Sequence, residues 1–526
     1  MTRAWADLMQ GLRFAWSRVA GERSTVGILI STAMLFAGLL ALTILGALAA
    51  AAPQLVLVLI GALALLVGLA ALFYTLAPGG PIWVRACLMV VMAHLLFSYG
   101  FGNATVGVGG ARVPISEVIL LVSLGGSAAY FWRVGFGRLP MALWFFLVWL
   151  VFLLAIHLPV GFARYGSPAL RDALPTVQAL FVIPGYCVGH LALSDPAKRN
   201  WAVRCLLGLG VALALYGLLY PLQTTLLALS PRVTGLQQSV PLVGYYTTWP
   251  TVAVTGLFGV LLWRWAMPQP ARRTLVTAAA LLLLTGFGLG FLLMQSRGGY
   301  VMFVVVTVMM LALRGQRGTV LRVAVLLLTG LLLLAVVGAS GLEIKGRIGQ
   351  LSLDTISAHL LTLSGEAESG SGLEGAAAGI EQRSRWGTQS LKMWSADIQS
   401  MVVGVGYGPA LTDFVVGGAG GRPIVVREPH NSYVTTLTRM GAVGFLVMMT
   451  IHTVTLLAAL RLYRWHLHRG ERSLAGFTLG CAVFFVCNYV NAIGQPNFES
   501  PHFVVPYFFL AGVIAAMDRM RTNDHR

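Results

Sequence analysis

The stretch VREPHNSYVTTLTRMGAVG, from Val426 to Gly444, passes from a polar segment directly into a hydrophobic run. It contains His430 and Asn431, with Arg427 and Arg439 on either side. Ionisable groups at the border of a membrane helix cost free energy to hold and tend to mark function. We therefore expect a loop that the rest of the chain holds against one face of a membrane.

The composition around this stretch is that of a membrane protein. Of the 526 residues, 57% are hydrophobic and only 10% are charged, whereas a soluble domain is typically about 25% charged. Apolar runs of about 20 residues recur along the chain, and a helix needs that length to span hydrocarbon. The first run, 26–50, is too long for a signal peptide, so we expect a retained span after a cytoplasmic amphipathic segment, 1–25.

The sequence therefore predicts an all-α polytopic membrane protein with about 14 transmembrane helices. The expected helices are 26–50, 53–75, 82–100, 114–133, 140–158, 175–194, 200–220, 247–267, 273–295, 299–314, 319–340, 433–460, 474–494 and 503–518. The first eleven occupy 26–340 and the last three occupy 433–518. Between them we expect one large, mostly helical extracytoplasmic loop, 341–432, and at the end a short cytoplasmic tail, 519–526.

The charges test this topology. The net charge is +18, but the basic residues stand in twos and threes between apolar runs, without the single aromatic-lined patch that nucleic-acid binding needs. They gather in alternate loops, which places both termini in the cytoplasm by the positive-inside rule. All five cysteines fall within expected spans, so neither a disulfide framework nor a cysteine metal site is expected.

The large loop has its own composition, because 341–429 holds half of the 18 acidic residues. Ser364–Ile380 is rich in Gly, Ser and Ala, as in a linker. Glu381–Ser400 is expected to be a helix with an apolar face that includes Trp386. Met401–Gly408, MVVGVGYG, ends in a glycine turn, and no lysine follows it as in a nucleotide-binding P-loop.

The motif at His430 resembles a known signature. His-Asn is followed by nine residues, Gly, two residues and Gly, on the way into a membrane helix. This pattern is similar to that of the O-antigen ligase and polysaccharide polymerase superfamily of membrane glycosyltransferases. Three other stretches resemble the same family in the same order: SPRVTG around Arg232, QSRGGY around Arg297, and RSRW at 383–386 followed by GVGYG at 404–408. Two features depart from the pattern: the interval between Trp386 and Gly404 is long, and Arg383 and Arg385 compete for one position.

The resemblance implies an activity. Members of the superfamily take a glycan from polyprenyl (undecaprenyl) diphosphate and transfer it to a sugar hydroxyl at the periplasmic face of the bacterial inner membrane. In the ligases of lipopolysaccharide biosynthesis the acceptor is the lipid A–core, and in the polymerases, including those of exopolysaccharides, it is another repeat unit. The implied partners are a lipid-linked glycan donor, a glycolipid or glycan acceptor, and membrane lipids.

The chemistry of that reaction selects candidate residues. Negative charge develops on the leaving diphosphate, and either a metal ion or arginines must stabilise it. The acidic residues of the loop are dispersed, so we expect no metal and no cofactor. Arginines bind phosphate oxygens bidentately, and the candidates are Arg297 as a catalytic residue and Arg232 with one of Arg383 or Arg385 as substrate ligands.

His430 is the candidate base, since a neutral imidazole can accept the proton of the acceptor hydroxyl. Asn431 would orient the imidazole or bind a sugar. The structural alternatives are that His430 only precedes a helix N-cap at Asn431 or Ser432, and that Arg297 only anchors a hairpin at the lipid headgroups. A carboxylate at Glu499, in the last extracytoplasmic turn, could tune His430.

Two charged pairs have plainer interpretations. Arg427 and Glu428 are expected to be a solvated pair. Arg171 either extends an anion-binding surface or forms a salt bridge with Asp172.

Two other classes of protein compete with the enzyme. A transporter or flippase of lipid-linked glycans would show internal repeats and broken helices at mid-membrane. No repeat is evident here, and the informative polar residues gather on one face. A non-catalytic partner in a polysaccharide export complex differs from the enzyme only in lacking activity.

Overall fold

The computed structural model describes residues 81–108, 111–134, 140–193, 209–220, 223–234, 239–244, 248–266, 273–313, 315–339, 346–349, 351–362, 374–413, 415–417 and 423–524. These residues all belong to one compact unit, Leu65–Arg526. The N-terminal segment 1–25 and the expected spans 26–50 and 53–75 lie outside the described residues.

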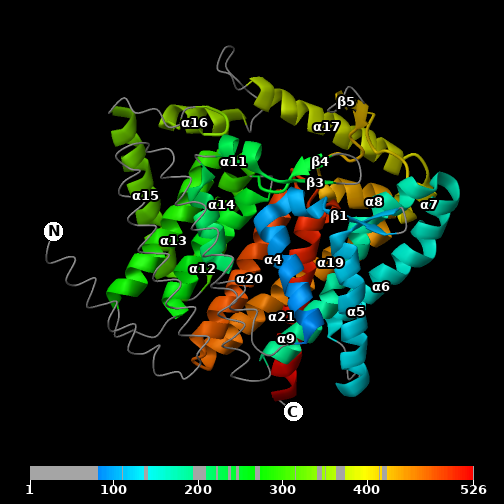
Figure 1. Ribbon diagram of the computed structural model, residues 1–526, viewed down its shortest axis with the longest axis horizontal. Coiled ribbons are helices and arrows are strands. Elements are labelled where there is room, and N and C mark those ends of the chain that lie inside the picture. Colours follow the sequence, from blue (N-terminus) through cyan, green and yellow to red (C-terminus); the bar gives the residue numbers. More distant parts are fainter. Residues whose placement is uncertain are drawn as a thin grey trace. The chain divides into compact units, whose positions relative to one another are not determined.

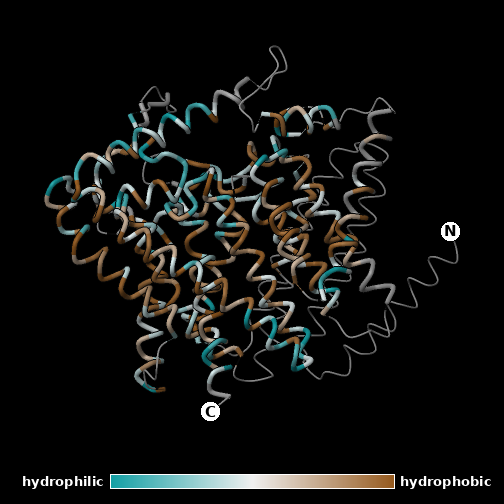
Figure 2. The backbone as a smooth tube through the Cα atoms, turned by 180° about the vertical axis from the view of Figure 1, so that it is seen from behind, coloured by the Kyte–Doolittle hydropathy of each residue, from teal (hydrophilic) through white to brown (hydrophobic). Residues whose placement is uncertain are grey.

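The described chain is mostly helical, and seven of its helical stretches are long and apolar enough to cross a membrane. They are Ile82–Gly102, Ile115–Val134, Met141–Tyr165, Ser167–Leu193, Ser432–His468, Arg472–Ala492 and Pro501–Thr522. Shorter apolar helices cover Leu209–Leu218, Ala279–Met294 and Arg297–Ala312. Figure 2 shows the hydrophobic colour along the middle of the helices. The protein is therefore a helical membrane protein.

The first half of the described chain contains helices α4 to α12. Their bounds are α4 Ile82–Gly102, α5 Ile115–Val134, α6 Met141–Phe152, α7 Leu158–Tyr165, α8 Ser167–Gln178, α9 Val182–Leu193, α11 Gln223–Leu229 and α12 Trp249–Ala266. A π-helical turn, Leu153–His157, joins α6 to α7, and a 3₁₀ turn, Ala179–Phe181, joins α8 to α9. The expected spans 140–158 and 175–194 are therefore longer in the structure, as the helical stretches Met141–Tyr165 and Ser167–Leu193. Both extend into the segment that was expected to be a loop between them.

The second half contains the helices of the large loop and the last three long helices. Their bounds are α13 Arg273–Met294, α14 Arg297–Ala312, α15 Arg317–Ala339, α16 Leu353–Leu361, α17 Glu374–Trp394, α18 Ile398–Val403, α19 Ser432–His468, α20 Arg472–Ala492 and α21 Pro501–Asp524. Figure 1 shows α16 and α17 lying across one end of the other helices, opposite to the C-terminal end of α21. The helix expected over Glu381–Ser400 is thus present, but it begins earlier and breaks before α18.

Three two-stranded antiparallel hairpins interrupt the helices in the described ranges. They pair β1 Thr105–Val108 with β2 Ala111–Pro114, β3 Arg232–Thr234 with β4 Ser239–Pro241, and β5 Val415–Gly417 with β6 Pro423–Val425. Each hairpin connects helices and takes no part in a larger sheet. Strands of three or four residues are too short to show an alternating pattern, so these hairpins were not predicted from the sequence.

Helix α19 is kinked at Gly441, where φ is +63°. The kink lets the backbone of α18 approach closely, because a Cβ on Gly441 would lie 2.3 Å from the carbonyl oxygen of Val402. Gly404, with φ +83°, meets the same joint from the other side, and its Cβ would lie 2.3 Å from Arg439 O. Glycine at both positions allows backbone-to-backbone contact in a left-handed conformation that other residues rarely adopt.

Candidate active site

His430 stands directly before α19 in a conformation that is unusual for its residue type. Its φ is +53°, in the left-handed region that costs a non-glycine residue free energy. The helix begins immediately afterwards, since Asn431 is the N-cap and its Oδ1 accepts the backbone N–H groups of Tyr433 and Val434 at 3.1 Å. The capping role considered for Asn431 is therefore present, and it fixes the chain next to His430.

The imidazole of His430 packs against the indole of Trp386 on α17, with 5.4 Å between the ring centroids. Burial and, to a smaller extent, the positive charge of Arg383 lower the pKa of His430 to about 4, against a hydrogen bond with Gln495 that raises it. Its Nδ1 is buried and has no hydrogen-bonding partner among the described residues. The ring is thus neutral at physiological pH, with a nitrogen free for a proton or a ligand.

Two further arginines, Arg297 and Arg347, lie close enough to Arg383 to interact with it electrostatically. Burial lowers the pKa of Arg383, and the charges of Arg297 and Arg347 lower it further. Among the described residues, no carboxylate lies within ion-pair distance of Arg347 or Arg383. We call Arg297, Arg347 and Arg383 the arginine cluster. Like charges held together in this way repel one another, and a bound anion would relieve the repulsion.

The three arginines come from three elements. Arg297 is the first residue of α14, after the N-cap Ser296, and its Nη1 donates to Thr362 Oγ1 at 3.1 Å at the end of α16. Arg383 lies on α17, and its Nη1 is 3.8 Å from where a Cβ of Gly494 would stand. That glycine precedes Gln495, so Arg383 and His430 both meet the turn after α20.

Arg347 was not singled out by any motif. Its backbone N–H donates to Leu293 O at 2.9 Å and its Nε to Met294 O at 3.0 Å, so it caps the C-terminal end of α13. Gln295 holds the same turn, since its Oε1 accepts the N–H of Ile348 at 2.8 Å. The helix C-terminus attracts a cation, and these bonds fix the guanidinium from one side.

His359, on α16, responds to the same charges. Burial and, to a smaller extent, the charges of Arg297 and Arg347 lower its pKa to about 4. Helix α16 thus carries a histidine close to the arginine cluster, and α17 carries Arg383, a member of the cluster.

The other two candidate arginines lie elsewhere. The side chain of Arg385 is 77% exposed and forms an ion pair with Glu381 at 2.7 Å, one turn back along α17. Arg232 is exposed on β3, and its Nη1 donates to Ser239 O at 3.4 Å within its own hairpin. Of the predicted site residues, Arg383 lies close enough to interact electrostatically with both Arg297 and the candidate base His430, whereas Arg385 and Arg232 have their contacts elsewhere.

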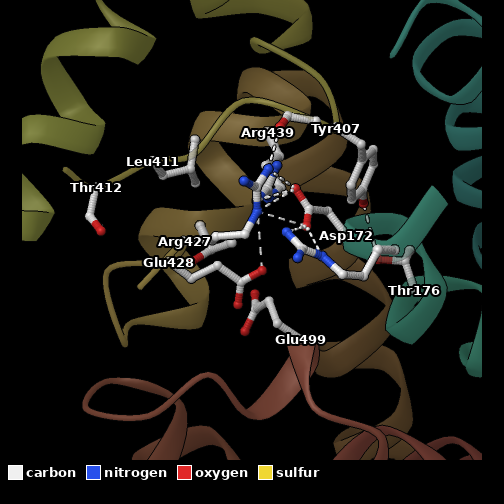
Figure 3. Close-up of polar contacts among 12 residues, drawn as sticks. Asp172, Thr176, Tyr407, Leu411, Thr412, Arg427, Glu428, Arg439 and Glu499 are labelled. Atoms are coloured by element: carbon white, nitrogen blue, oxygen red, sulfur yellow. Dashed lines mark hydrogen bonds and ion pairs between the residues drawn. The ribbon is translucent and has the colours of Figure 1, made fainter. Parts of the chain in front are cut away.

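A second group of charges gathers around the buried carboxylate of Asp172 (Figure 3). The carboxylate of Asp172 on α8 is 3% exposed, and it is 2.8 Å from Arg427 Nη2 and 3.3 Å from Arg439 Nη2. Arg171 approaches the same carboxylate at 3.2 Å, as considered from the sequence. The interpretation of Arg427 and Glu428 as a solvated pair is wrong, because Arg427 binds Asp172, a residue distant in sequence, and Glu428 faces Arg439 at 3.7 Å.

Two acids lie near the start of α19. Burial raises the pKa of Glu428, and burial together with the charge of Glu428 raises that of Glu499. The Oε2 of Glu499 accepts the hydroxyl of Ser432, which is the first residue of α19. Glu499 therefore reaches the helix start beside His430, and its bond is with Ser432.

No protein-family model matches the sequence, and no curated protein shows significant similarity to it.

Proposed function

We propose that this protein is a membrane glycosyltransferase that transfers a glycan from a polyprenyl diphosphate to a sugar hydroxyl. The proposed type is an O-antigen ligase, with undecaprenyl diphosphate as the carrier and the lipid A–core as acceptor, at the periplasmic face of the bacterial inner membrane. The observation that carries the proposal is that Arg383, a member of the arginine cluster, and the imidazole of His430 both lie at the turn formed by Gly494 and Gln495 after α20.

The arginine cluster supplies what a diphosphate donor needs. Three positive charges, from α14, the turn at 346–349 and α17, lie close enough that those of Arg297 and Arg347 lower the pKa of Arg383. A guanidinium stays protonated and donates two parallel hydrogen bonds to phosphate oxygens. Fixed donors of this kind stabilise the charge that develops on the leaving diphosphate in the transition state. In this proposal Arg297, Arg347 and Arg383 bind the diphosphate without a metal ion.

The transfer step then uses the neutral imidazole. The acceptor hydroxyl oxygen forms a bond to the anomeric carbon of the donor glycan, while the bond from that carbon to the diphosphate oxygen breaks. The electron pair of the broken bond leaves with polyprenyl diphosphate, and the hydroxyl proton passes to His430. Trp386 supports the imidazole from one side and Gln495 binds it.

A polymerase of polysaccharide repeat units would use the same residues. Its leaving group is also a polyprenyl diphosphate and its nucleophile is also a sugar hydroxyl. The two activities differ in the acceptor alone, so the test below includes both.

The proposed topology has 14 membrane helices with both termini in the cytoplasm. The positive-inside rule supports it, since Arg469 follows α19 and Arg472 begins α20, at the end of α19 away from His430. Arg519 and Arg521 lie near the C-terminus of α21, at the end opposite to α16 and α17 (Figure 1).

Expression in two bacterial strains tests the function, one lacking its O-antigen ligase and one lacking its O-antigen polymerase. We expect the ligase-deficient strain to recover a lipopolysaccharide ladder on a gel. If the ladder recovers only in the polymerase-deficient strain, the proposed activity is that of a polymerase and not of a ligase. The purified protein in proteoliposomes, given undecaprenyl-diphosphate-linked O-antigen and lipid A–core, provides the direct assay. If neither strain recovers the ladder and the purified protein transfers no glycan, the proposed glycosyltransferase function is wrong.

A further inference from the structure

We propose that Asp172 is a positioning residue, which binds Arg427 and Arg439 and thereby holds His430 in its left-handed conformation against Trp386. The catalytic consequence rests on the proposed function, since it concerns the base of the transfer reaction. The structural part, that Asp172 fixes His430, can be tested without any substrate.

The carboxylate of Asp172 contacts two arginines that lie on either side of His430 in the sequence. Asp172 Oδ2 accepts from Arg427 Nη2 at 2.8 Å and from Arg439 Nη2 at 3.3 Å, and Arg427 Nε donates to Oδ1 at 3.1 Å. Arg427 lies three residues before His430, and Arg439 lies two turns into α19 after it. Asp172 thus ties α8 to the chain on both sides of His430 (Figure 3).

The same two guanidinium groups also hold the glycine turn at 404–408. Arg427 Nη2 donates to Gly408 O, and Arg439 Nη1 donates to Gly406 O at 3.4 Å. Tyr407 adds a link to α8, because its hydroxyl is 3.0 Å from that of Thr176. The turn, α8 and α19 therefore share one set of buried polar contacts.

This set of contacts extends to α17, which carries Trp386 and Arg383. The hydroxyl of Ser390 donates to Leu411 O at 3.1 Å, just after the glycine turn. The hydroxyl of Thr438 on α19 donates to Ser390 O at 3.3 Å. A change in the turn or in α19 would therefore move α17 relative to His430.

His430 needs such support, because its left-handed backbone is strained and persists only where neighbouring contacts fix it. After it, the cap at Asn431 fixes the chain. Before it, the described contacts include those of Arg427 with Asp172, of Glu428 with Arg439, and of Val426, whose carbonyl accepts the Thr412 hydroxyl. Without Asp172 the buried charges of Arg427 and Arg439 would lose their closest carboxylate, and this part of the support would fail.

Space beside Asp172 makes a conservative test possible. A small cavity of about 20 Å³ is lined by Asp172, Arg439, Tyr407 and Glu499, among others. That volume is enough for about one water molecule. The longer side chain of an Asp172→Glu variant therefore has room to keep its charge near both guanidinium groups.

Transfer kinetics in proteoliposomes give the first test, with Asp172→Asn, Asp172→Glu and the matched control Arg171→Ala. Arg171 contacts the same carboxylate from a partly exposed position. We expect Asp172→Asn to lower kcat roughly 100-fold while KM for the lipid-linked donor changes less than about 3-fold, because no arginine of the cluster contacts Asp172 and Arg297 and Arg347 keep their own bonds to Thr362 and Met294. Asp172→Glu should recover kcat to within about 10-fold of wild type, and Arg171→Ala should stay near wild type. Unchanged kcat in Asp172→Asn, or a rise in KM equal to the loss in kcat, would overturn the proposal.

Thiol labelling gives the second test and needs no activity. A His430→Cys variant is labelled with a membrane-impermeant maleimide, alone and combined with Asp172→Asn or Arg171→Ala, and the labelling of the parent chain is subtracted. We expect faster labelling with Asp172→Asn and no change with Arg171→Ala. Equal rates in all three would refute the positioning role even if transfer activity is present. If the wild type transfers no glycan, the proposed function fails and the labelling still decides the role of Asp172.

Folding is checked by gel filtration in detergent. Should Asp172→Asn aggregate, Arg427→Gln replaces it in both tests, since it removes the guanidinium charge on one side of His430 and leaves Asp172 paired with Arg439. For Arg427→Gln we expect the lower kcat and the faster labelling given above for Asp172→Asn. An unchanged kcat or an unchanged labelling rate in Arg427→Gln would overturn the proposal.

Discussion

The imidazole of His430 lies 5.4 Å from the indole of Trp386, measured between ring centroids, and Trp386 follows Arg383 by three residues on α17. Residues three apart share a helix face, so one face of α17 carries both the ring that supports His430 and a member of the arginine cluster. The candidate base and the candidate donor site are therefore coupled through one helix. Charge bound at the cluster changes the electrostatic environment of the imidazole.

This coupling predicts a difference between two pH profiles. Burial and Arg383 lower the pKa of His430 to about 4 in the unliganded protein. A base must be unprotonated, so kcat/KM should fall only below about pH 4–5, since it reports the free enzyme. A bound diphosphate offsets the charge of Arg383 and raises the pKa of His430, so kcat, which reports the complex, should begin to fall at a higher pH.

The pH profiles are measured with a lipid-linked donor in proteoliposomes. As a control, His430→Gln should lose both acidic limbs together with most of the activity. If kcat and kcat/KM begin to fall at the same acidic pH, the charge of the bound donor does not change the pKa of His430.

Arg383 and Arg385 form a matched pair on one helix. Arg383→Ala should lower kcat/KM by about 10²–10³-fold, the usual effect of removing one donor to a developing negative charge. Arg385→Ala should stay within about 3-fold of wild type, because its exposed ion pair with Glu381 contributes little. The comparison is made by donor titration in the same membranes. Equal losses in the two variants would contradict the assignment of Arg383 to the cluster.

Arg347 should matter as much as the arginine found by motif. We expect Arg347→Ala and Arg297→Ala each to abolish transfer while expression and membrane insertion persist. Arg347→Lys should restore little, because lysine offers no Nε–H for Met294 O together with a two-pronged group for phosphate. Activity is read from lipopolysaccharide gels and protein level from immunoblots of the membrane fraction. An Arg347→Ala variant with wild-type transfer would remove this residue from the site.

Features that depend on neighbouring residues alone, such as apolar helices and a helix cap, could be predicted from the sequence. The long apolar runs predicted the helices of the described chain, and the Asn431 side chain caps α19 as its position before a helix suggests. The expected spans 140–158 and 175–194 were too short, because α7 and the first turns of α8 are polar enough to resemble a loop in the sequence.

Tertiary contacts account for what the sequence did not reveal. The choice between Arg383 and Arg385 depends on which face of α17 meets Gly494 and His430. The spacing held a signal, since Arg383 lies three residues before Trp386 on the expected apolar face, but the sequence did not show that this face meets His430. Arg347 lies in a polar loop, and only its bonds to the end of α13 bring it to the cluster. Arg427 looked like the partner of its neighbour, yet its carboxylate partner is Asp172 on a distant helix.

The kink in α19 provides a prediction of stability. A Cβ at Gly441 would lie 2.3 Å from Val402 O and 2.5 Å from Gly404 N, at a φ of +63°. Gly441→Ala should therefore cost on the order of 2–4 kcal/mol, from backbone strain and from forcing α18 away. The loss appears as a lower midpoint in thermal unfolding in detergent. It should also reduce transfer activity, because α18 is joined to the glycine turn behind His430.

Gly480 on α20 is the matched control, since nothing lies within 4 Å of where its Cβ would stand. Alanine is the better helix former by about 1 kcal/mol, so Gly480→Ala should keep or slightly raise the midpoint. If Gly441→Ala unfolds at the same temperature as Gly480→Ala, the backbones of α18 and α19 are not in contact at this joint. The route from Asp172 through the glycine turn to His430 would then lose its rigid support, because that support requires the two backbones to touch.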